Sequence, residues 1–385
     1  GAPQKGPGPD EWQNPTLRVG GDAHIAPRPD GRDWLVETNR PVVEPPGRCG
    51  HRPLRGGRGK VTKKDLRRNM KKICLRCAGF LLILALFLGI LSAVFYPKGR
   101  GYNDGLENPR IWAFQAEPEN SLEVLAIGDS LLMCGYSPLD VWTQRGYTGF
   151  GCCTGNQRLT QSLRMLEAFC ENQSPKVVFL EADSLYHPID SQDILRDRVL
   201  PLIPALEYHD NWKFLKPAQA LQCVHYDNTM VERGYYLRKA VSPADPGDYM
   251  APQDGNDPIP AQSLRILGRM ADRCRERGIT QVLFSLPSPA NWNDAAHRAV
   301  EAVSENMGLH YVDLNREDLG LDWSRDTLDG GDHLNDRGAE KASAFLGRLL
   351  EGYGLEDRRE NENYERWHRD FERFTALAAD AEDTL

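Results

Sequence analysis

A short apolar run that ends in a glycine and two polar residues constrains the fold of this chain more than any other feature. Val124–Ile127 is apolar and partly β-branched, as expected of a strand that is buried on both faces of a sheet. Gly128 ends the run, and Asp129 and Ser130 follow directly. Because open α/β sheets bind ligands at the carboxyl ends of their strands, this order predicts a serine hydroxyl at a ligand-binding edge.

Between about residues 120 and 353, short apolar runs alternate with segments of helical periodicity. This alternation predicts an α/β fold, namely a three-layer α/β/α domain of flavodoxin-like type with a parallel sheet. An insertion is expected at 187–260, where the alternation is lost. The expected strands are Val124–Ile127, Val177–Glu181, Gln281–Leu286 and Tyr311–Leu314, and the expected helices are Pro138–Arg145, Leu159–Asn172, Gln262–Arg277, Asp294–Met307 and Arg337–Tyr353.

A second constraint is the stretch Ala78–Tyr96, which has 19 residues and no charge. As a helix rising about 1.5 Å per residue, it is long enough for a hydrocarbon core about 30 Å thick. Eight Lys and Arg residues lie between Lys60 and Arg76, directly before it. The positive-inside rule then predicts a single-pass anchor in the cell membrane, with a cytoplasmic amino end and an extracellular carboxyl-terminal domain. A cleaved signal peptide is the alternative.

The net charge of the chain differs in sign before and after this basic cluster. The first 76 residues contain 17 of the 47 Lys and Arg and 8 of the 55 Asp and Glu, a net charge of +9. The rest therefore has 30 basic and 47 acidic residues, a net charge of −17. An acidic main body argues against nucleic acid as a partner.

The remaining segments are assigned from composition and periodicity. Residues 1–69 are expected to be a disordered basic tail, and function is expected to begin near Met70. Residues 70–97 form the cytoplasmic flank and membrane helix, and 98–119 a linker. Residues 354–385 are expected to contain a terminal helix that docks through aromatic side chains, with a glycan-stacking surface as the alternative: Tyr364, Trp367, Phe371 and Phe374.

A second polar motif, Asp329-Gly-Gly-Asp-His-Leu-Asn335, follows Ser130 by about 200 residues and precedes the last helix of the domain. A serine hydroxyl is a weak nucleophile at neutral pH and needs a base. His333 is the candidate base, and a carboxylate would hold its ring in the correct tautomer. Both Asp329 and Asp332 are candidates for that carboxylate, and the sequence leaves the choice open.

These motifs resemble those of the SGNH/GDSL hydrolase superfamily. Gly128-Asp129-Ser130 matches its first block and Asp332-His333-Leu334-Asn335 its last, and the resemblance covers about 120–353. Together with the apolar helix and Tyr136-Ser137-Pro138, they resemble the membrane-anchored, cell-surface SGNH proteins of Gram-positive bacteria. Those are similar to the proteins that transfer acyl groups on teichoic acids and exopolysaccharides. The resemblance implies that Ser130 is the nucleophile and His333 the base.

The same resemblance implies a cell-surface serine esterase or O-acyltransferase that acts on an envelope polysaccharide through an acyl-enzyme on Ser130. The glycopolymer and a multi-pass membrane acyltransferase are the implied partners. The alternative is a catalytically inactive glycan-binding or assembly subunit of an envelope polymer modification complex. Peptidase or thioesterase chemistry is a further alternative for the same residues.

The sequence departs from the superfamily at two places, the acid position before the histidine and the asparagine of the third block. The family's acid position, three residues before the histidine, is Gly330 here. The glycine block that supplies an oxyanion amide is expected within Thr154–Gln157, with Gly155, Asn156 and Gln157 as pocket candidates. Asp183 stands where the family has an asparagine that donates to the oxyanion, and a carboxylate there would oppose the developing negative charge. This departure is compatible with a slow hydrolase, an acyltransferase with other donors or an inactive relative.

Two further side chains, Asp129 and Asn291, are candidates for the pocket. Asp129 precedes the nucleophile, and Asn291 follows a strand end, where it lines the pocket or forms a turn. Glu181 and Asp183 could be a carboxylate pair for acid/base chemistry or metal binding, but the favoured interpretation is that one of them is hydrogen-bonded structurally at the strand end. No metal or other cofactor is expected, because the chain lacks a Gly-rich phosphate loop and the histidines have no ligand spacing: His187, His209, His225 and His297.

Overall fold

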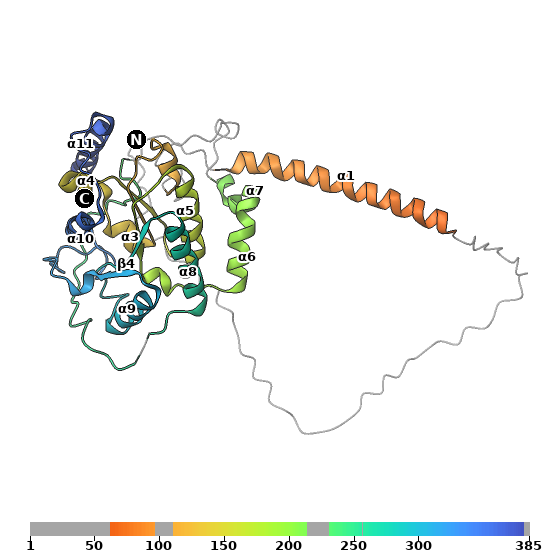
Figure 1. Ribbon diagram of the computed structural model, residues 1–385. Coiled ribbons are helices and arrows are strands. Elements are labelled where there is room, and N and C mark those ends of the chain that lie inside the picture. The colour runs from red at the N-terminus through yellow and green to blue at the C-terminus, as the bar shows by residue number, and fades with distance from the viewer. Residues whose placement is uncertain (1–61, 97–110, 214–230, 256, 381–385) are drawn as a thin grey trace, which may run out of the picture. The chain divides into compact units, whose positions relative to one another are not determined.

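The protein is described here by a computed structural model that covers residues 62–96, 111–213, 231–255 and 257–380 (Figure 1). At its centre is a five-stranded sheet in which every neighbouring pair is parallel, in the order β2-β1-β3-β4-β5. This is the flavodoxin-like strand order, so the predicted fold class is confirmed. The strands are β1 Val124–Gly128, β2 Gly149–Cys153, β3 Val177–Glu181, β4 Thr280–Ser285 and β5 His310–Asp313.

Helices connect these strands, as parallel pairing requires. The α-helices of the domain are α3 Ser130–Gly135, α4 Pro138–Arg145, α5 Leu159–Asn172, α6 Ser191–Val199, α7 Pro204–Glu207, α8 Ala261–Glu276, α9 Asp294–Met307, α10 Asp336–Leu349 and α11 Glu365–Asp380. Short 3₁₀ helices are η1 Ala113–Ala116, η2 Asp183–Leu185, η3 Leu200–Leu202, η4 His209–Lys213, η5 Leu314–Arg316, η6 Leu350–Tyr353 and η7 Glu362–Tyr364.

The sheet is covered on both faces, which gives the three layers. Along β1, Leu125 and Ile127 pack in one apolar cluster with side chains of α5, α8 and α9. The alternate residues Val124 and Ala126 pack in a second cluster with side chains of α3 and α10. Burial on both faces explains why the strand sequences are apolar runs without polar alternation.

One strand of the sheet was not predicted. β2 has the sequence Gly-Phe-Gly-Cys-Cys, and glycine is disfavoured in strands. This edge strand is nevertheless buried, because the segment around Arg233 lies against it: Gly151 N–H donates to the Arg233 carbonyl at 2.9 Å. Gly234 has φ +92°, and a Cβ there would clash with the Gly151 carbonyl oxygen. Only the tertiary contact makes this stretch a strand.

Other boundaries differ by one to a few residues. The helix α3 was not predicted, and it begins at Ser130, before the expected helix at Pro138. The expected final helix ends at Leu349 and continues as η6. The insertion at 187–260 contains α6, α7, η3 and η4, and its residues 214–230 and 256 lie outside the described part.

Two boundaries of the sequence-based division do not coincide with elements of the structure. The expected disordered tail, 1–69, includes the start of helix α1, Lys63–Phe95, and residues 1–61 lie outside the described part. The expected linker, 98–119, includes core residues, because Phe114 is fully buried among apolar side chains. The apolar ring of Phe114 is therefore part of the domain's core.

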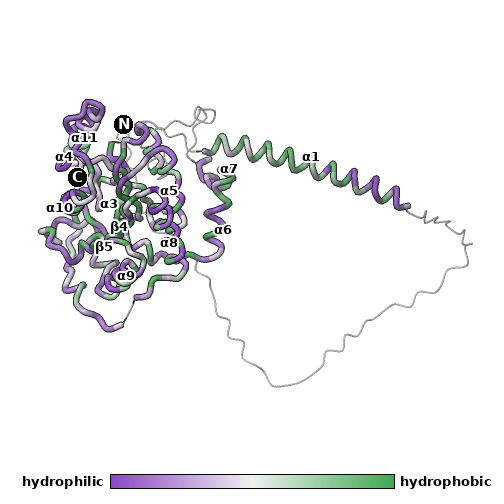
Figure 2. Tube along the Cα trace, in the orientation of Figure 1, coloured by the Kyte–Doolittle hydropathy of each residue, from purple (hydrophilic) through white to green (hydrophobic). Residues whose placement is uncertain are grey.

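Helix α1 is long and apolar enough to cross a membrane, and within the described residues it is the one helix that is. Figure 2 shows hydrophobic residues along most of α1 and hydrophilic residues toward its amino end. This is the pattern of an apolar span with a basic flank.

The terminal helix α11 packs on the domain through aromatic side chains. Trp367 and Phe374 are buried, and the Trp367 ring lies 5.1 Å from the ring of Trp142 in α4. The fully buried guanidinium of Arg233 lies over the Trp367 ring at 3.7 Å and binds Asp370 at 2.7 Å. Arg233 therefore links α11 to the chain segment that covers β2.

Candidate active site

Ser130 is held at the carboxyl end of β1 by a tight strand-to-helix turn. Asp129 is the N-cap of α3, and its Oδ1 accepts a hydrogen bond from Leu131 N–H at 2.9 Å. Gly128 is required by close packing, because a Cβ there would lie 2.7 Å from Cβ of Glu181. The turn places the Ser130 hydroxyl at the edge of the sheet where this fold binds ligands.

The hydroxyl of Ser130 meets the imidazole of His333. Ser130 Oγ lies 2.8 Å from Nε2 of His333, and Nδ1 of the same ring lies 2.7 Å from Oδ2 of Asp329. A carboxylate can only accept, so Nδ1–H donates to Asp329 and Nε2 is left to accept the Ser130 hydroxyl proton. These three side chains form the arrangement of a serine–histidine–acid relay.

The structure places Asp329, not Asp332, on the histidine. Asp329 also accepts a hydrogen bond from His333 N–H at 2.7 Å, so its carboxylate contacts both the ring and the backbone. Asp332 lies farther from Nδ1, at 3.5 Å, and accepts a hydrogen bond from Asn291 at 2.5 Å. Gly330 and Gly331 have φ of +77° and +98°, which lets the loop turn back on itself.

The loop that carries His333 is tied to the rest of the domain at several points. Ser288 Oγ donates to the Asp332 carbonyl at 2.7 Å, after β4. The segment that follows Gly234 also connects the two halves of the site: Tyr236 N–H donates to the Met133 carbonyl of α3 at 2.8 Å. Farther along that segment, Gly330 N–H donates to the Ser242 carbonyl at 3.0 Å. The nucleophile's helix and the base's loop are thus joined by backbone hydrogen bonds.

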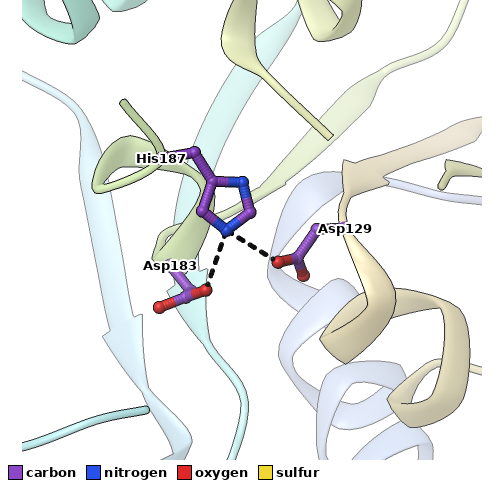
Figure 3. A group of neighbouring side chains, drawn as sticks. All are labelled: Asp129, Asp183 and His187. Carbon is purple, nitrogen blue, oxygen red and sulfur yellow. Dashed lines mark ion pairs between the residues drawn. The ribbon is translucent and has the colours of Figure 1, made fainter. Parts of the chain in front are cut away.

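A second cluster of polar side chains, formed by Asp129, Asp183 and His187, lies at the same end of the sheet (Figure 3). Nε2 of His187 lies 3.2 Å from Oδ2 of Asp129 and 3.4 Å from Oδ2 of Asp183, between the two carboxylates. Its Nδ1 lies 3.0 Å from the Gln157 carbonyl oxygen and donates to it. The other ring nitrogen therefore faces the carboxylates.

The protonation of this group follows from its burial and charges. Burial by itself lowers the pKa of His187, but hydrogen bonds to Asp129 and Asp183 outweigh it and raise the pKa to about 10. Burial raises the pKa of Asp183, and the charge of Asp129 adds to the rise. Burial also raises the pKa of Glu181 well above its usual range, with contributions from the Asp129 and Asp183 charges. These shifts favour the protonated ring of His187 at neutral pH, and burial disfavours the charged form of Glu181.

The pocket candidates from the sequence are only partly brought to Ser130. Gly155 and Asn156 form an exposed turn after β2, with Asn156 at φ +50°. The Gln157 side chain is fully buried and donates to the Cys152 carbonyl at 3.2 Å, so it supports this turn. Gln157 reaches the site through its carbonyl oxygen, which holds His187. The assignment of an oxyanion amide to this turn stays a prediction.

Sequence reasoning missed His187. The sequence-based interpretation found no ligand spacing for this histidine, yet it follows Asp183 by four residues, directly after the end of a buried strand. That spacing was the available signal. Two groups in the described residues have side-chain ligand atoms close enough to hold a cation, Asp129–Asp183–His187 and Asp329–Asp332–His333. The expectation that the chain binds no metal stays a prediction.

No protein-family model matches the chain, and no curated protein matches it. Solved structures with a similar backbone include a lipase/acylhydrolase from Enterococcus faecalis, with 14% identity and a TM-score of 0.34 over 62% of this chain and 100% of that one. A GDSL-like lipase from Bacteroides thetaiotaomicron has 13% identity and a TM-score of 0.30, over 60% of this chain and 87% of that one. A psychrotrophic esterase from Pseudoalteromonas sp. has 13% identity and a TM-score of 0.30, over 60% of this chain and 96% of that one.

Proposed function

We propose that this chain is a serine esterase or O-acyltransferase that works through an acyl-enzyme on Ser130. One observation carries the proposal: Ser130 Oγ, His333 and Asp329 are joined by two contacts of 2.8 and 2.7 Å. A serine paired with an imidazole that is itself oriented by a carboxylate is an activated nucleophile. Its position at the carboxyl end of β1 supports a role in binding and reaction.

In the first half of the reaction, Ser130 Oγ attacks the carbonyl carbon of an ester while His333 Nε2 takes the hydroxyl proton. Asp329 accepts from Nδ1–H and stabilises the imidazolium that forms. The tetrahedral intermediate then collapses, and the imidazolium donates its Nε2 proton to the leaving alcohol oxygen. The C–O bond to that alcohol breaks, and the acyl group stays on Ser130.

In the second half, an acceptor hydroxyl attacks the acyl-enzyme, and His333 again takes and returns one proton. If water is the acceptor, the products are a carboxylic acid and free enzyme. If a sugar hydroxyl is the acceptor, the acyl group is transferred. The same three side chains serve both reactions, so the acceptor that reaches the site decides between esterase and transferase.

We further propose an envelope polysaccharide as substrate and a cell-membrane location with the domain outside. The apolar part of α1 and the basic residues at the amino end of the same helix support an anchor with a cytoplasmic amino end. An anchored domain would act on polymers assembled at the outer face of the membrane, with a multi-pass acyltransferase as a donor of acyl groups. This extension is independent of the relay itself.

The experiment is hydrolysis of 4-nitrophenyl acetate by the full chain in detergent, compared with Ser130→Ala. We expect the release of 4-nitrophenol above background to be abolished by Ser130→Ala and retained by the control Ser191→Ala, an exposed serine at the start of α6. Equal rates for the native chain and Ser130→Ala would overturn the proposal and favour a binding role. Mass spectrometry of the quenched reaction should locate an acetyl group on Ser130.

A further inference from the structure

Three carboxyl groups lie at the end of the sheet that carries Ser130. In the sheet, β1 and β3 are neighbours, with Ile127 opposite Leu180. Asp129 lies just beyond β1, Glu181 ends β3, and Asp183 lies just beyond it. All three carboxyl groups are therefore close to the turn that carries the nucleophile. An oxygen that becomes negative at this turn would be repelled by any carboxylate left uncompensated.

The imidazole ring of His187 faces these carboxyl groups. His187 has 17% of its side chain exposed, and its Nε2–H is shared between Asp129 Oδ2 and Asp183 Oδ2. The Gln157 carbonyl accepts from Nδ1–H, so both ring nitrogens are donors, as in an imidazolium. The pKa of about 10 agrees with a charged ring at neutral pH. Glu181, whose pKa is raised well above its usual range by burial, is the third titratable carboxyl group at this end of the two strands.

The His187 ring also contacts Asp129, the residue that caps the helix of the nucleophile. Oδ1 of Asp129 caps α3 at Leu131 N–H, while Oδ2 is held by His187. The two oxygens of one carboxylate thus connect His187 to the turn that sets the position of Ser130. Loss of the ring would free Oδ2 and leave two adjacent carboxylates without a counter-charge.

We propose that His187 is a positioning residue of the Ser130 site, whose imidazolium offsets the Asp129 and Asp183 carboxylates and holds Asp129 on the nucleophile's turn. This inference rests on the proposed function, because it concerns the charge that develops when Ser130 attacks an ester. It explains how a carboxylate at position 183 is compatible with that chemistry. His187 supplies the positive charge beside the site.

The first test uses ester turnover by the full chain in detergent. His187→Gln keeps an N–H donor but removes the charge, and we expect it to lower kcat by about tenfold or more, with little change in KM. Adding Asp183→Asn to His187→Gln removes the charge that needs compensation and should restore most of kcat. His209→Gln, at an exposed histidine, is the matched control and should behave as the native chain.

Three outcomes would overturn the proposal. The first is a native kcat for His187→Gln, and the second is a double variant no more active than His187→Gln, which would indicate a merely structural role. The third is a stoichiometric divalent metal in the purified native chain with loss of activity in EDTA, which would place a metal ion and not a proton between the carboxylates.

A second measurement does not depend on the variants folding or on catalysis. Nuclear magnetic resonance of the native chain with isotope-labelled histidine should show a charged His187 ring at pH 8, which titrates near pH 10. A neutral His187 ring at pH 8 would overturn the inference. If Ser130→Ala keeps full activity while the ring is charged, the proposed function fails but the charge assignment stands.

Discussion

Ser130 Oγ and His333 Nε2 lie 2.8 Å apart although 203 positions separate the two residues in the chain. The contact joins the carboxyl end of β1 to the loop before α10, and the segment that includes Tyr236 and Ser242 bonds to both sides of it. A serine–imidazole pair at hydrogen-bond distance is ready for proton transfer without rearrangement.

The two aspartates of the histidine loop should differ in their effect on catalysis. Asp329→Asn removes the carboxylate that orients His333, and we expect kcat for 4-nitrophenyl acetate to fall by about 10²- to 10⁴-fold. Asp332→Asn is the matched control and should cost less than about tenfold, because Asp332 is 3.5 Å from Nδ1 and is held by Asn291. The opposite ranking of the two variants would show that Asp332 orients the ring.

A methyl group at Gly128 should destabilise the domain. The new Cβ would lie 2.7 Å from Cβ of Glu181 and 2.9 Å from Cβ of Leu132, so we expect a loss of about 1–3 kcal/mol in the free energy of unfolding. Gly268→Ala in α8 is the control, since its Cβ would have an ordinary 3.5 Å contact and alanine favours a helix. Urea denaturation followed by circular dichroism measures both. An unchanged midpoint for Gly128→Ala would contradict the packing described here.

The buried ion pair under α11 should be important for stability. Arg233→Met leaves Asp370 without its 2.7 Å partner and removes the cation over the Trp367 ring, so we expect a loss of about 3 kcal/mol. Arg273→Met, at an exposed pair with Glu276, should leave the free energy of unfolding nearly unchanged, because solvent screens the pair. Chemical denaturation measures both losses, and limited proteolysis should release α11 first. Comparable losses for the two variants would argue against the role of Arg233.

The stability of the domain should fall as the pH rises from neutral to alkaline values. The pKa of His187 is about 10 in the folded chain and near 6.5 when unfolded, so the folded state binds the proton more tightly. Its contribution is complete below about pH 6.5 and is lost as the pH rises through about 10. Urea midpoints at pH 6, 8 and 10 should decrease for the native chain and decrease less for His187→Gln. Parallel decreases in the two would refute the assignment.

The orientation of α1 is open to a direct test. With Lys63 and the following basic residues on the cytoplasmic side, a tag at the carboxyl end should bind antibody on intact cells, and a tag at the amino end only after permeabilisation. Replacement of the basic residues before Ala78 with neutral ones should weaken this asymmetry. Labelling of the amino-terminal tag on intact cells would reverse the proposed orientation.

Much of the fold could be predicted because the information is local. Val124–Ile127 and Val177–Glu181 are apolar runs of strand length. The bounds of α4 and α9 agree with prediction because an N-cap serine or asparagine and a terminal glycine mark them. The strand β2 could not be predicted, because its glycines and cysteines have no strand propensity and only the cover from Arg233 and Gly234 buries it.

The candidate site, like the fold, could be predicted only where neighbouring residues in the sequence carry the signal. The sequence by itself determined that an Asp-Ser pair follows a buried strand and that a histidine with two nearby aspartates precedes the last helix, because strand, turn and helix signals are set by neighbouring residues. Only the tertiary structure decided that Asp329 and not Asp332 meets His333, and that His187 lies between Asp129 and Asp183. Those choices depend on distances between segments far apart in the chain, which no local pattern contains.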